Sequence, residues 1–230
     1  YYGLQNLVLI PGSVGAAPIQ NIGAYGVELV SLFESLRGWD LQAQAFRELT
    51  AADCRFAYRE SVFKHELKAR FFITEVTLRL STRPTVAMDY RALRQQLFEQ
   101  GISQPTPQQL AEAVIAIRTS KLPDPAQLPN AGSFFKNPVM DKKQFERLLR
   151  HYPAMVHYPQ DNGEVKLAAA WLLEKAGWKG FRRGPVGMHT EQSIVMVNYD
   201  NASGADVLAL AHDIQQDIDD KFGVQLEIEP

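Results

Sequence analysis

The chain has 230 residues, of which 46% are hydrophobic and 22% charged, and its formal net charge at pH 7 is −2. This length and apolar content can supply the core of one large domain or two ordinary ones, which excludes a chain that is disordered throughout. A nearly neutral chain lacks the basic field that favours nucleic acid or an anionic membrane, so we expect neither as a partner.

The cysteine and histidine content limits the chemistry and the compartment. The single cysteine, Cys54, cannot form an internal disulfide, and we expect it to be a small buried core residue rather than a reactive thiol. No apolar run has the length of a membrane span or of a secretory core segment, so we expect a cytoplasmic protein. The five histidines show no spacing typical of metal ligands, and we predict no metal site.

The two ends of the sequence predict that it is a fragment. Tyr1, Tyr2 and Gly3 lead within a few residues to the apolar segment 7–10, which leaves no room for a first structural unit. Residues 224–230 alternate between apolar and polar side chains, as a half-buried strand does, and then stop without a turn.

A glycine-rich loop between Ile10 and Gly26 is the first distinctive segment. It contains four glycines and two prolines and almost no charge. Glycine permits positive φ and close approach, and the small side chains of Ala16, Ala17 and Ala24 leave room for a flat or anionic ligand against the main chain. We interpret the loop as a ligand-binding segment, with a tight loop packed on its own sheet as the alternative.

Strands dominate the part of the chain that follows this loop. Residues 27–49 and 71–80 are rich in β-branched and aromatic side chains, which favour strands. Between them, the spacing of Thr50 and Asp53 is typical of a helix N-cap and predicts a short helical turn. Residues 81–105 then predict an excursion that contains a short helix.

A capping box begins the next helix and two prolines end it. Thr106 to Gln109 form the box, and Leu110, Val114 and Ile117 then fall on one face. The prolines in segment 118–125 prevent the helix from continuing, so this segment is the best candidate for a domain boundary.

The second half of the chain reads as an α+β domain. We predict helices over 141–152 and 166–176 and a strand over 193–199. Ser203 then caps a long amphipathic helix that Gly223 ends before the final strand, which completes a strand–helix–strand unit.

A cluster of polar residues lies just beyond the proline boundary, between Asn130 and Pro138. It combines the Ser133 hydroxyl, amides and the Lys136 cation with two phenylalanines, a combination that suits a binding or catalytic site. No G-x-S-x-G motif is present, so a hydrolase triad has no support. Taken alone, a serine in this setting is more often a turn or capping residue than a catalyst.

Several of these segments, taken in order, resemble the UDP-N-acetylenolpyruvoylglucosamine reductase family, also called UDP-N-acetylmuramate dehydrogenases. They are Pro-Ile-Gln-Asn-Ile-Gly-Ala-Tyr-Gly at 18–26, Tyr-Arg at 58–59, Lys-Leu-Pro-Asp-Pro at 121–125, Asn-Ala-Gly-Ser-Phe-Phe-Lys-Asn-Pro at 130–138 and Val-Lys-Leu-Ala-Ala at 165–169. The resemblance covers essentially the whole chain. Agreement of several motifs in one order is specific, whereas the glycine loop alone would be a weak signal.

The resemblance implies an α+β fold in two parts. Residues 1–120 would be the second part of a PCMH/VAO-like FAD-binding domain, with a lid excursion at about 81–105 that carries Tyr90. Residues 121–230 would be a smaller α+β domain that binds the UDP-sugar. The resemblance further implies a monomeric cytoplasmic flavoprotein that serves peptidoglycan synthesis, and through it cell-wall biogenesis, cell shape and cell division.

The implied reaction is the NADPH-driven reduction of UDP-N-acetylglucosamine enolpyruvate to UDP-N-acetylmuramate, with FAD as the hydride carrier. The implied catalytic residues are Arg59 as the active-site cation, Ser133 as the proton donor and Glu229 as the catalytic glutamate. The residues expected to bind FAD are Gly23, Ala24, Tyr25 and Arg118. Those expected to hold the UDP-sugar are Tyr90, Lys121, Asn137, Tyr158, Lys166 and Gln192.

The sequence departs from the family pattern at both ends. The N-terminal flavin-binding subdomain with its glycine-rich diphosphate loop is absent, and so is the arginine expected just past Glu229. We therefore expect this chain to be inactive on its own. Two alternatives remain: a cofactor-free UDP-sugar-binding module, and a FAD oxidoreductase of the same broad fold that acts on another substrate.

Overall fold

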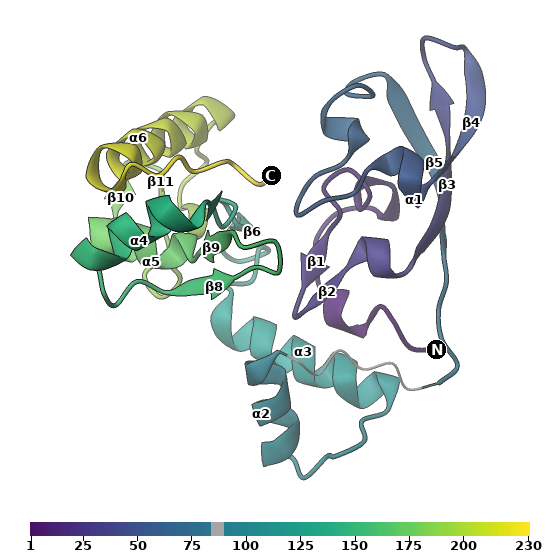
Figure 1. Cartoon of the computed structure of the whole chain (residues 1–230), viewed down its shortest axis with the longest axis horizontal. Helices are drawn as coiled ribbons and strands as arrows, with labels where there is room; N and C mark the ends of the chain where they lie inside the picture. The colour runs from purple at the N-terminus through teal and green to yellow at the C-terminus, as the bar shows by residue number, and fades with distance from the viewer. Residues whose placement is uncertain (84–89) are drawn as a thin grey trace. The chain divides into compact units, whose positions relative to one another are not determined.

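A computed structural model describes residues 1–83 and 90–230 of the chain (Figure 1). The chain forms two compact units, Tyr1–Ser120 and Lys121–Pro230. Both combine helices with antiparallel sheets, which confirms the predicted α+β class. Residues 84–89, which fall within the predicted excursion 81–105, lie outside the described residues. In the part of the chain that is described, no helix is both long enough and apolar enough to cross a membrane.

The main sheet of the first unit has three antiparallel strands in the order β4-β3-β5. They are β3 (Phe33–Asp40), β4 (Ala45–Thr50) and β5 (Phe71–Leu78), and they confirm the strands predicted around residues 27–49 and 71–80. Two short strands, β1 (Gly23–Ala24) and β2 (Val27–Glu28), form a separate hairpin. The 3-10 helices of this unit are η1 (Gln5–Leu7), η2 (Val14–Ala16), η3 (Leu29–Ser31) and η4 (Val62–Lys64).

The short helix α1 (Ala51–Cys54) follows β4 and begins with the predicted capping box. The Thr50 side chain accepts a hydrogen bond from the Asp53 backbone N–H, and the Asp53 carboxylate accepts one from the Thr50 N–H at 2.9 Å. Cys54 is buried in the core beneath the sheet, and burial raises the pKa of its thiol to about 12. The expectation of a small buried core residue is therefore confirmed.

Two helices complete the first unit, α2 (Arg91–Glu99) and α3 (Pro107–Lys121). The α2 helix confirms the predicted short helix in the excursion. The N-terminus of α3 has the predicted box, because the Thr106 N–H donates to Gln109 Oε1 at 2.9 Å and the Gln109 N–H donates to Thr106 Oγ1 at 3.2 Å. The buried side chains of the two helices form a cluster of their own, made by Leu93, Leu97, Leu110, Ala113, Val114 and Ile117.

The second unit contains two antiparallel sheets. The four-stranded sheet has the order β10-β11-β12-β6 and is made of β6 (Asn130–Ser133), β10 (Arg182–Arg183), β11 (Val186–Met188) and β12 (Val195–Asn198). The three-stranded sheet has the order β7-β9-β8 and is made of β7 (Val139–Met140), β8 (His157–Pro159) and β9 (Val165–Leu167). The predicted strand over 193–199 is confirmed as β12.

Three helices pack with these sheets: α4 (Lys142–His151), α5 (Ala169–Ala176) and α6 (Gly204–Phe222). The α4 helix confirms the prediction over 141–152, with the Asp141 carboxylate accepting from the Gln144 N–H at its N-terminus. The α6 helix confirms the predicted Ser203 cap. It ends at Gly223, whose φ of 62° is the left-handed conformation that glycine adopts without steric cost.

Two predictions for the second unit are wrong. Lys166 lies in strand β9, not in a helix, and α5 begins only at Ala169, because Val165 and Leu167 are buried on one face while β9 pairs with both β7 and β8. The final strand is also absent: residues 224–229 make only an isolated bridge between Phe135 and Ile228. The alternation of buried Val224 and Leu226 with exposed Gln225 and Glu227 is nevertheless present, and the segment is paired through that one bridge rather than as a full strand.

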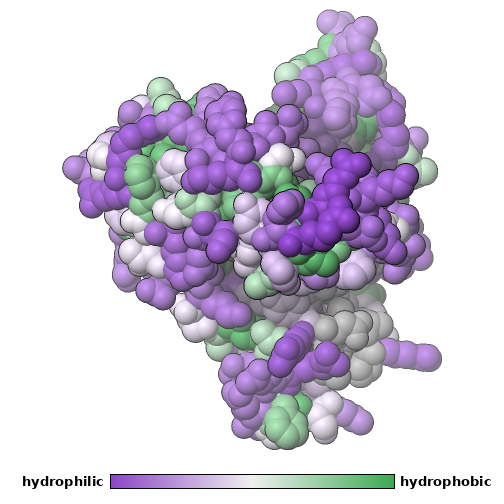
Figure 2. Space-filling model, turned by 60° about the vertical axis from the view of Figure 1, so that its left-hand side comes forward, coloured by the Kyte–Doolittle hydropathy of each residue, from purple (hydrophilic) through white to green (hydrophobic). Residues whose placement is uncertain are grey.

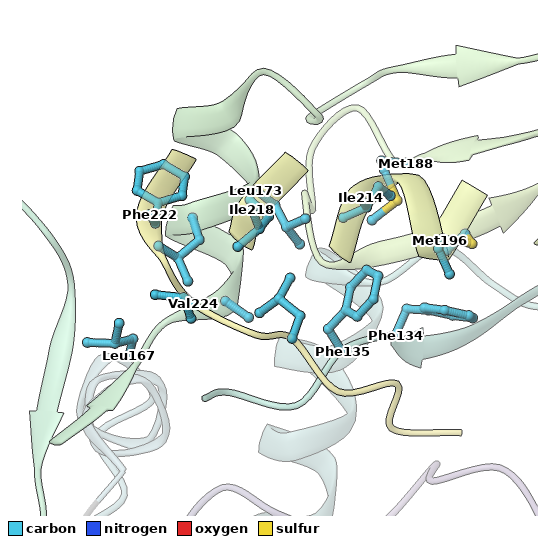
Figure 3. Close-up of a cluster of buried hydrophobic side chains, with 14 of the residues drawn as sticks. Phe134, Phe135, Leu167, Leu173, Met188, Met196, Ile214, Ile218, Phe222 and Val224 are labelled. Carbon is cyan, nitrogen blue, oxygen red and sulfur yellow. The ribbon is translucent and has the colours of Figure 1, made fainter. Parts of the chain in front are cut away.

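The core of the second unit is a single cluster that joins both sheets, α5, α6 and the extended C-terminal segment. Figure 3 shows that Phe135 and the α6 side chains point toward one another in this cluster. The face of the molecule drawn in Figure 2 is mostly hydrophilic, with hydrophobic residues in small separate areas. Each unit thus has its own apolar interior, which fixes the loops that carry the candidate residues.

Candidate functional site

The candidate residues of the first unit gather around the β1–β2 hairpin. Gly23 pairs with Glu28, and Ala24 pairs with Val27. The two turn residues have positive φ, 51° at Tyr25 and 81° at Gly26, which is typical of the tight type I′ turn. The end of the glycine-rich loop therefore folds back sharply and exposes its backbone.

Arg59 lies at a second tight turn and contacts this hairpin. Ala57 and Glu60 exchange two backbone hydrogen bonds of 3.1 Å, which closes the turn that carries Tyr58 and Arg59. Arg59 has a φ of 54°, and this left-handed conformation costs a non-glycine residue roughly 1–2 kcal/mol. Its Nη2 donates to the Gly23 carbonyl at 2.5 Å, and its guanidinium lies 5.2 Å from the centre of the Tyr58 ring. The structure thus brings the predicted residues Arg59 and Gly23 together.

A third group in this unit joins Tyr25, Tyr90 and Arg118. The rings of Tyr25 and Tyr90 meet edge to face with their centres 5.1 Å apart. Burial raises the pKa of Tyr25, the charge of Arg118 opposes this shift, and Tyr90 adds to it. Arg118 also donates to the Leu9 carbonyl at 3.3 Å, so it lies close to the start of the glycine-rich loop.

A pocket of about 600 Å³ opens on the glycine-rich loop in this unit. The residues that line it are mostly apolar: Leu4, Gln5, Leu7, Val8, Ile10, Pro11, Gly12, Ser13, Val14, Ala16, Ala17, Gln20, Ile22, Leu29, Leu78, Pro107, Gln108 and Ala111. Gln20 Oε1 is buried and has no hydrogen-bond partner among the described residues. A buried amide oxygen of this kind needs a donor, which a ligand in the pocket can supply.

The pocket includes the earlier part of the glycine-rich loop but none of the four predicted cofactor residues. Gly23, Ala24, Tyr25 and Arg118 are not among its lining residues, whereas the earlier part of the loop and Gln20 are. Sequence analysis did not single out Gln20, although it lies in the loop that was interpreted as ligand-binding. The missing signal was the burial of its amide oxygen, which only the folded structure reveals.

In the second unit, Ser133 and Glu229 lie on either side of Phe134. Ser133 is the exposed last residue of β6 and pairs with Val195 of β12. The Glu229 N–H donates to the Phe134 carbonyl at 2.9 Å, which holds the extended C-terminal segment against the end of β6. Two of the predicted catalytic residues are therefore close in the fold although they are far apart in the sequence.

Four of the predicted substrate residues lie in the β7-β9-β8 sheet or near the start of α5. Lys166 of β9 pairs directly with Tyr158 of β8. Asn137 accepts a hydrogen bond from the Ala169 N–H at 2.9 Å through its side-chain oxygen, and so it caps the first turn of α5. Gln192 precedes Ser193, whose hydroxyl donates to the Ala170 carbonyl at 2.7 Å in the same turn of α5.

Lys121 is the last residue of α3 and is exposed. Within the described part of the chain, no hydrogen bond or ion pair connects it to the other candidate residues. Nor do three or more His, Cys, Asp or Glu side chains come together as metal ligands would in the described ranges.

Comparison with known proteins shows which family this chain is similar to. The family model for the C-terminal domain of UDP-N-acetylenolpyruvoylglucosamine reductase matches residues 124–230. Proteins named UDP-N-acetylenolpyruvoylglucosamine reductase from Pseudomonas aeruginosa and Pseudomonas syringae are 55% and 54% identical over 228 residues. The one from Burkholderia multivorans is 51% identical over 230 residues.

These relatives align with 99% of this chain, which spans 67% of the length of the two Pseudomonas proteins and 66% of the Burkholderia protein. Among solved structures, UDP-N-acetylenolpyruvylglucosamine reductase (MurB) from Thermus caldophilus superposes with a TM-score of 0.65 at 23% identity. That superposition covers 99% of this chain and 63% of the other. At this identity the structural likeness supports the fold alone.

Proposed function

Because the chain belongs to the UDP-N-acetylenolpyruvoylglucosamine reductase family, we propose that it serves the reduction of UDP-N-acetylglucosamine enolpyruvate to UDP-N-acetylmuramate. The observation that supports this proposal is sequence identity: over 228 aligned positions, more than half of the residues are the same as in proteins of that name. The product is a precursor of peptidoglycan, so the proposed role is in bacterial cell-wall synthesis. We further propose that the protein acts as a monomer in the cytoplasm.

The proposed cofactor is FAD, reduced by NADPH, and the residues of the first unit suit a flavin. A pocket of about 600 Å³ with an apolar lining is large enough for a planar ring system, and the buried Gln20 oxygen offers an acceptor for a ring N–H. FAD supplies hydride transfer from NADPH to the methylene carbon of the enolpyruvyl ether. We assign residues 1–120 to this cofactor, with Gly23, Ala24, Tyr25 and Arg118 beside it, and residues 121–230 to the UDP-sugar.

The chain's own residues carry the remaining chemistry of the proposal. Addition of hydride to the methylene carbon leaves negative charge on the enolate beside the substrate carboxylate, and the Arg59 guanidinium stabilises that charge. Ser133 donates a proton to the adjacent carbon, and Glu229 assists through its protonation state. The hydrogen bond from the Glu229 N–H to the carbonyl of Phe134, the residue that follows Ser133, supports a shared role for Ser133 and Glu229.

The remaining proposed roles concern substrate binding. Lys121 and Lys166 are cations that suit the diphosphate or a carboxylate. Tyr90, Asn137, Tyr158 and Gln192 offer aromatic surface and hydrogen-bonding groups. Within the second unit, the pairing of Lys166 with Tyr158 and the position of Asn137 at the start of α5 support a shared binding surface for these three residues.

Substitution of Ser133 by alanine tests the proposal in the complete protein as its gene encodes it. In Ser133→Ala, the rate of flavin reduction by NADPH should stay unchanged, because no proton from Ser133 is needed in that step. Reoxidation of the flavin by the enolpyruvyl sugar should slow roughly 100-fold or more, the usual effect of removing a general acid. Stopped-flow absorbance of the flavin measures the two steps separately.

Ser35→Ala is the matched control, because it also removes one serine hydroxyl but lies on β3. It should leave both half-reactions at the wild-type rate. Equal slowing of both half-reactions in Ser133→Ala would contradict the assigned role. Binding of UDP-sugars by the wild type without any flavin turnover would instead refute the reductase and favour a cofactor-free binding module.

A further inference from the structure

Asn21, in the glycine-rich loop, is a buried polar residue whose side chain forms three hydrogen bonds. It is 0% exposed, and its φ of 44° is a left-handed conformation that asparagine tolerates better than most residues. Its Nδ2 donates to Glu28 Oε2 at 2.9 Å and to the Ala57 carbonyl at 3.1 Å. Its Oδ1 accepts from the Val30 N–H at 2.9 Å. One side chain therefore joins the loop, the end of the β1–β2 hairpin and the turn that carries Arg59.

The Arg59 turn is tied to the glycine-rich loop at both of its ends. Asn21 holds Ala57, the residue that opens the turn. Ser61, which directly follows the turn, donates its hydroxyl hydrogen to the Ile19 carbonyl at 2.5 Å and is itself buried. Because both ends are held by the same loop, the turn is kept in place relative to that loop.

The hairpin side of the Asn21 network also leads to Arg59. Glu28 lies directly across the hairpin from Gly23, whose carbonyl accepts from Arg59. A methyl group added to Gly23 would lie 2.9 Å from Arg59 Nη1 and 3.0 Å from Glu28 Cγ. The two side chains therefore border the same small space beside Gly23, which links the position of Glu28 to that of the Arg59 guanidinium.

We propose that Asn21 is a positioning residue for Arg59: its amide fixes both the turn that carries the arginine and the hairpin that accepts the arginine's hydrogen bond. This inference rests on the proposed function, in which Arg59 meets negative charge on the substrate. Asn21 itself is buried and acts on Arg59 indirectly, through its hydrogen bonds to Glu28 and Ala57. An arginine with positive φ keeps this strained backbone conformation only where the surrounding structure holds it. The hydrogen bond from Asn21 to the Ala57 carbonyl is part of that surrounding structure.

The test is Asn21→Asp in the complete protein, because aspartate keeps the shape, the acceptor and the tolerance of positive φ, whereas its ionised form removes both donors and sets a second carboxylate against that of Glu28. Calorimetric Kd values for UDP-N-acetylmuramate, which carries a carboxylate, and for UDP-N-acetylglucosamine, which lacks it, isolate the contribution of carboxylate recognition. The variant should weaken binding of the first ligand about tenfold and leave the second within twofold. Flavin reoxidation by the enolpyruvyl sugar should slow roughly 10- to 100-fold, with reduction by NADPH unchanged.

A double variant tests the contact itself. In Asn21→Asp with Glu28→Gln, the glutamine amide can donate to the new carboxylate, so the hydrogen bond returns with reversed direction and part of the lost rate should be recovered. A double variant no better than Asn21→Asp alone would show that the link through Glu28 is wrong. Ser61→Ala cuts the second tie and should give the same selective loss, which keeps the inference testable if Asn21→Asp does not fold.

Asn198→Asp is the matched control in the other unit, where the asparagine side chain accepts from the Ala202 N–H at 2.7 Å and donates to the Ala202 carbonyl at 3.1 Å. It should lower thermal stability without changing the ratio of the two Kd values. Equal weakening of both ligands in Asn21→Asp, or equal slowing of both half-reactions, would overturn the positioning role. A wild-type protein that does not reduce the enolpyruvyl sugar would refute the proposed function instead.

Discussion

At the scale of single residues, the Asp40 carboxylate, at the end of β3, is held by several hydrogen bonds. It is completely buried and accepts hydrogen bonds from Arg70 Nε at 3.0 Å and Nη2 at 2.9 Å, from Arg47 Nη1 at 2.8 Å, and from the Gln42 and Ala43 N–H groups. Hydrogen bonds from Arg70, followed by those from Ala43 and Arg47, hold the pKa of Asp40 well below its usual range. The ionised form is thus the one that the fold requires.

The stability of the protein should therefore depend on pH through Asp40. A carboxyl group whose pKa is lowered on folding stabilises the folded state above its unfolded pKa of about 3.9, and this contribution is lost as pH falls toward the folded pKa. Asp40→Asn should unfold at lower urea concentration than the wild type at pH 7, and the difference should narrow below about pH 4. Urea unfolding followed by circular dichroism at several pH values measures it.

Glu75→Gln is the control for Asp40, because Glu75 forms an exposed ion pair with Arg37 on the same sheet. Exposed pairs contribute little, so this variant should follow the wild type at every pH. A difference between Asp40→Asn and the wild type that stays constant down to pH 3 would contradict the proposed titration.

The sequence could predict individual site residues only where a motif marked them. Gly23, Arg59 and Ser133 belong to recognisable segments, whereas Glu229 was implied only by the family resemblance; the structure shows Gly23 beside Arg59 and Glu229 beside Phe134. Asn21 lies in one of those segments too, but its importance depends on Ala57, 36 positions away. No local pattern reports such a partner, because side-chain hydrogen bonds between distant segments depend on the finished fold.

At the scale of elements, capping signals were the most dependable part of the sequence. Ser203 begins α6 with a reciprocal capping box, in which its hydroxyl accepts from the Asp206 N–H at 3.2 Å and its own N–H donates to Asp206 Oδ2 at 2.8 Å. Hydrogen bonds from the Ser203 side chain and backbone also lower the pKa of Asp206. Such boxes are local in sequence, which is why the starts of α1, α3 and α6 were all predictable.

Ser203→Ala should reduce the free energy of unfolding by about 1 kcal/mol, the usual cost of losing a serine cap. Because α6 contributes Leu210, Ile214 and Ile218 to the core, fraying at its start should lower the melting temperature of the unit that contains it. Differential scanning calorimetry measures the change. Ser203→Asp, which also caps helices well, should restore most of the loss, and failure to do so would contradict a capping role.

The elements that sequence could not predict are those whose identity depends on distant pairing. Lys166 was predicted to begin a helix, but β7 and β8 pair with it on either side and make it part of a strand. The C-terminal segment shows the opposite case, since its alternating pattern matches a strand but only Ile228 forms a bridge. Periodicity reports which side chains are buried, not which backbone groups find partners.

At the scale of the whole molecule, the chain consists of two units that each contain a core. All buried residues of the largest cluster belong to Lys121–Pro230, and the two other clusters belong to Tyr1–Ser120. A unit that closes its own hydrophobic core has the main requirement for independent folding.

We therefore expect Lys121–Pro230, produced alone, to fold cooperatively. Its thermal unfolding should be a single transition with coincident circular dichroism and tryptophan fluorescence curves, because Trp171 and Trp178 pack against its core. Tyr1–Ser120 produced in the same way is the natural comparison. Gradual, non-coincident unfolding of Lys121–Pro230 would show that its core depends on the rest of the protein.

The cap that Asn137 provides for α5 also restricts what this side chain can recognise. Its oxygen is occupied by the Ala169 N–H, so the orientation of the amide is fixed and its nitrogen is turned the opposite way. A ligand group that meets this nitrogen must accept a hydrogen bond, which favours phosphate, carboxylate or carbonyl oxygens there over a group that presents only an N–H.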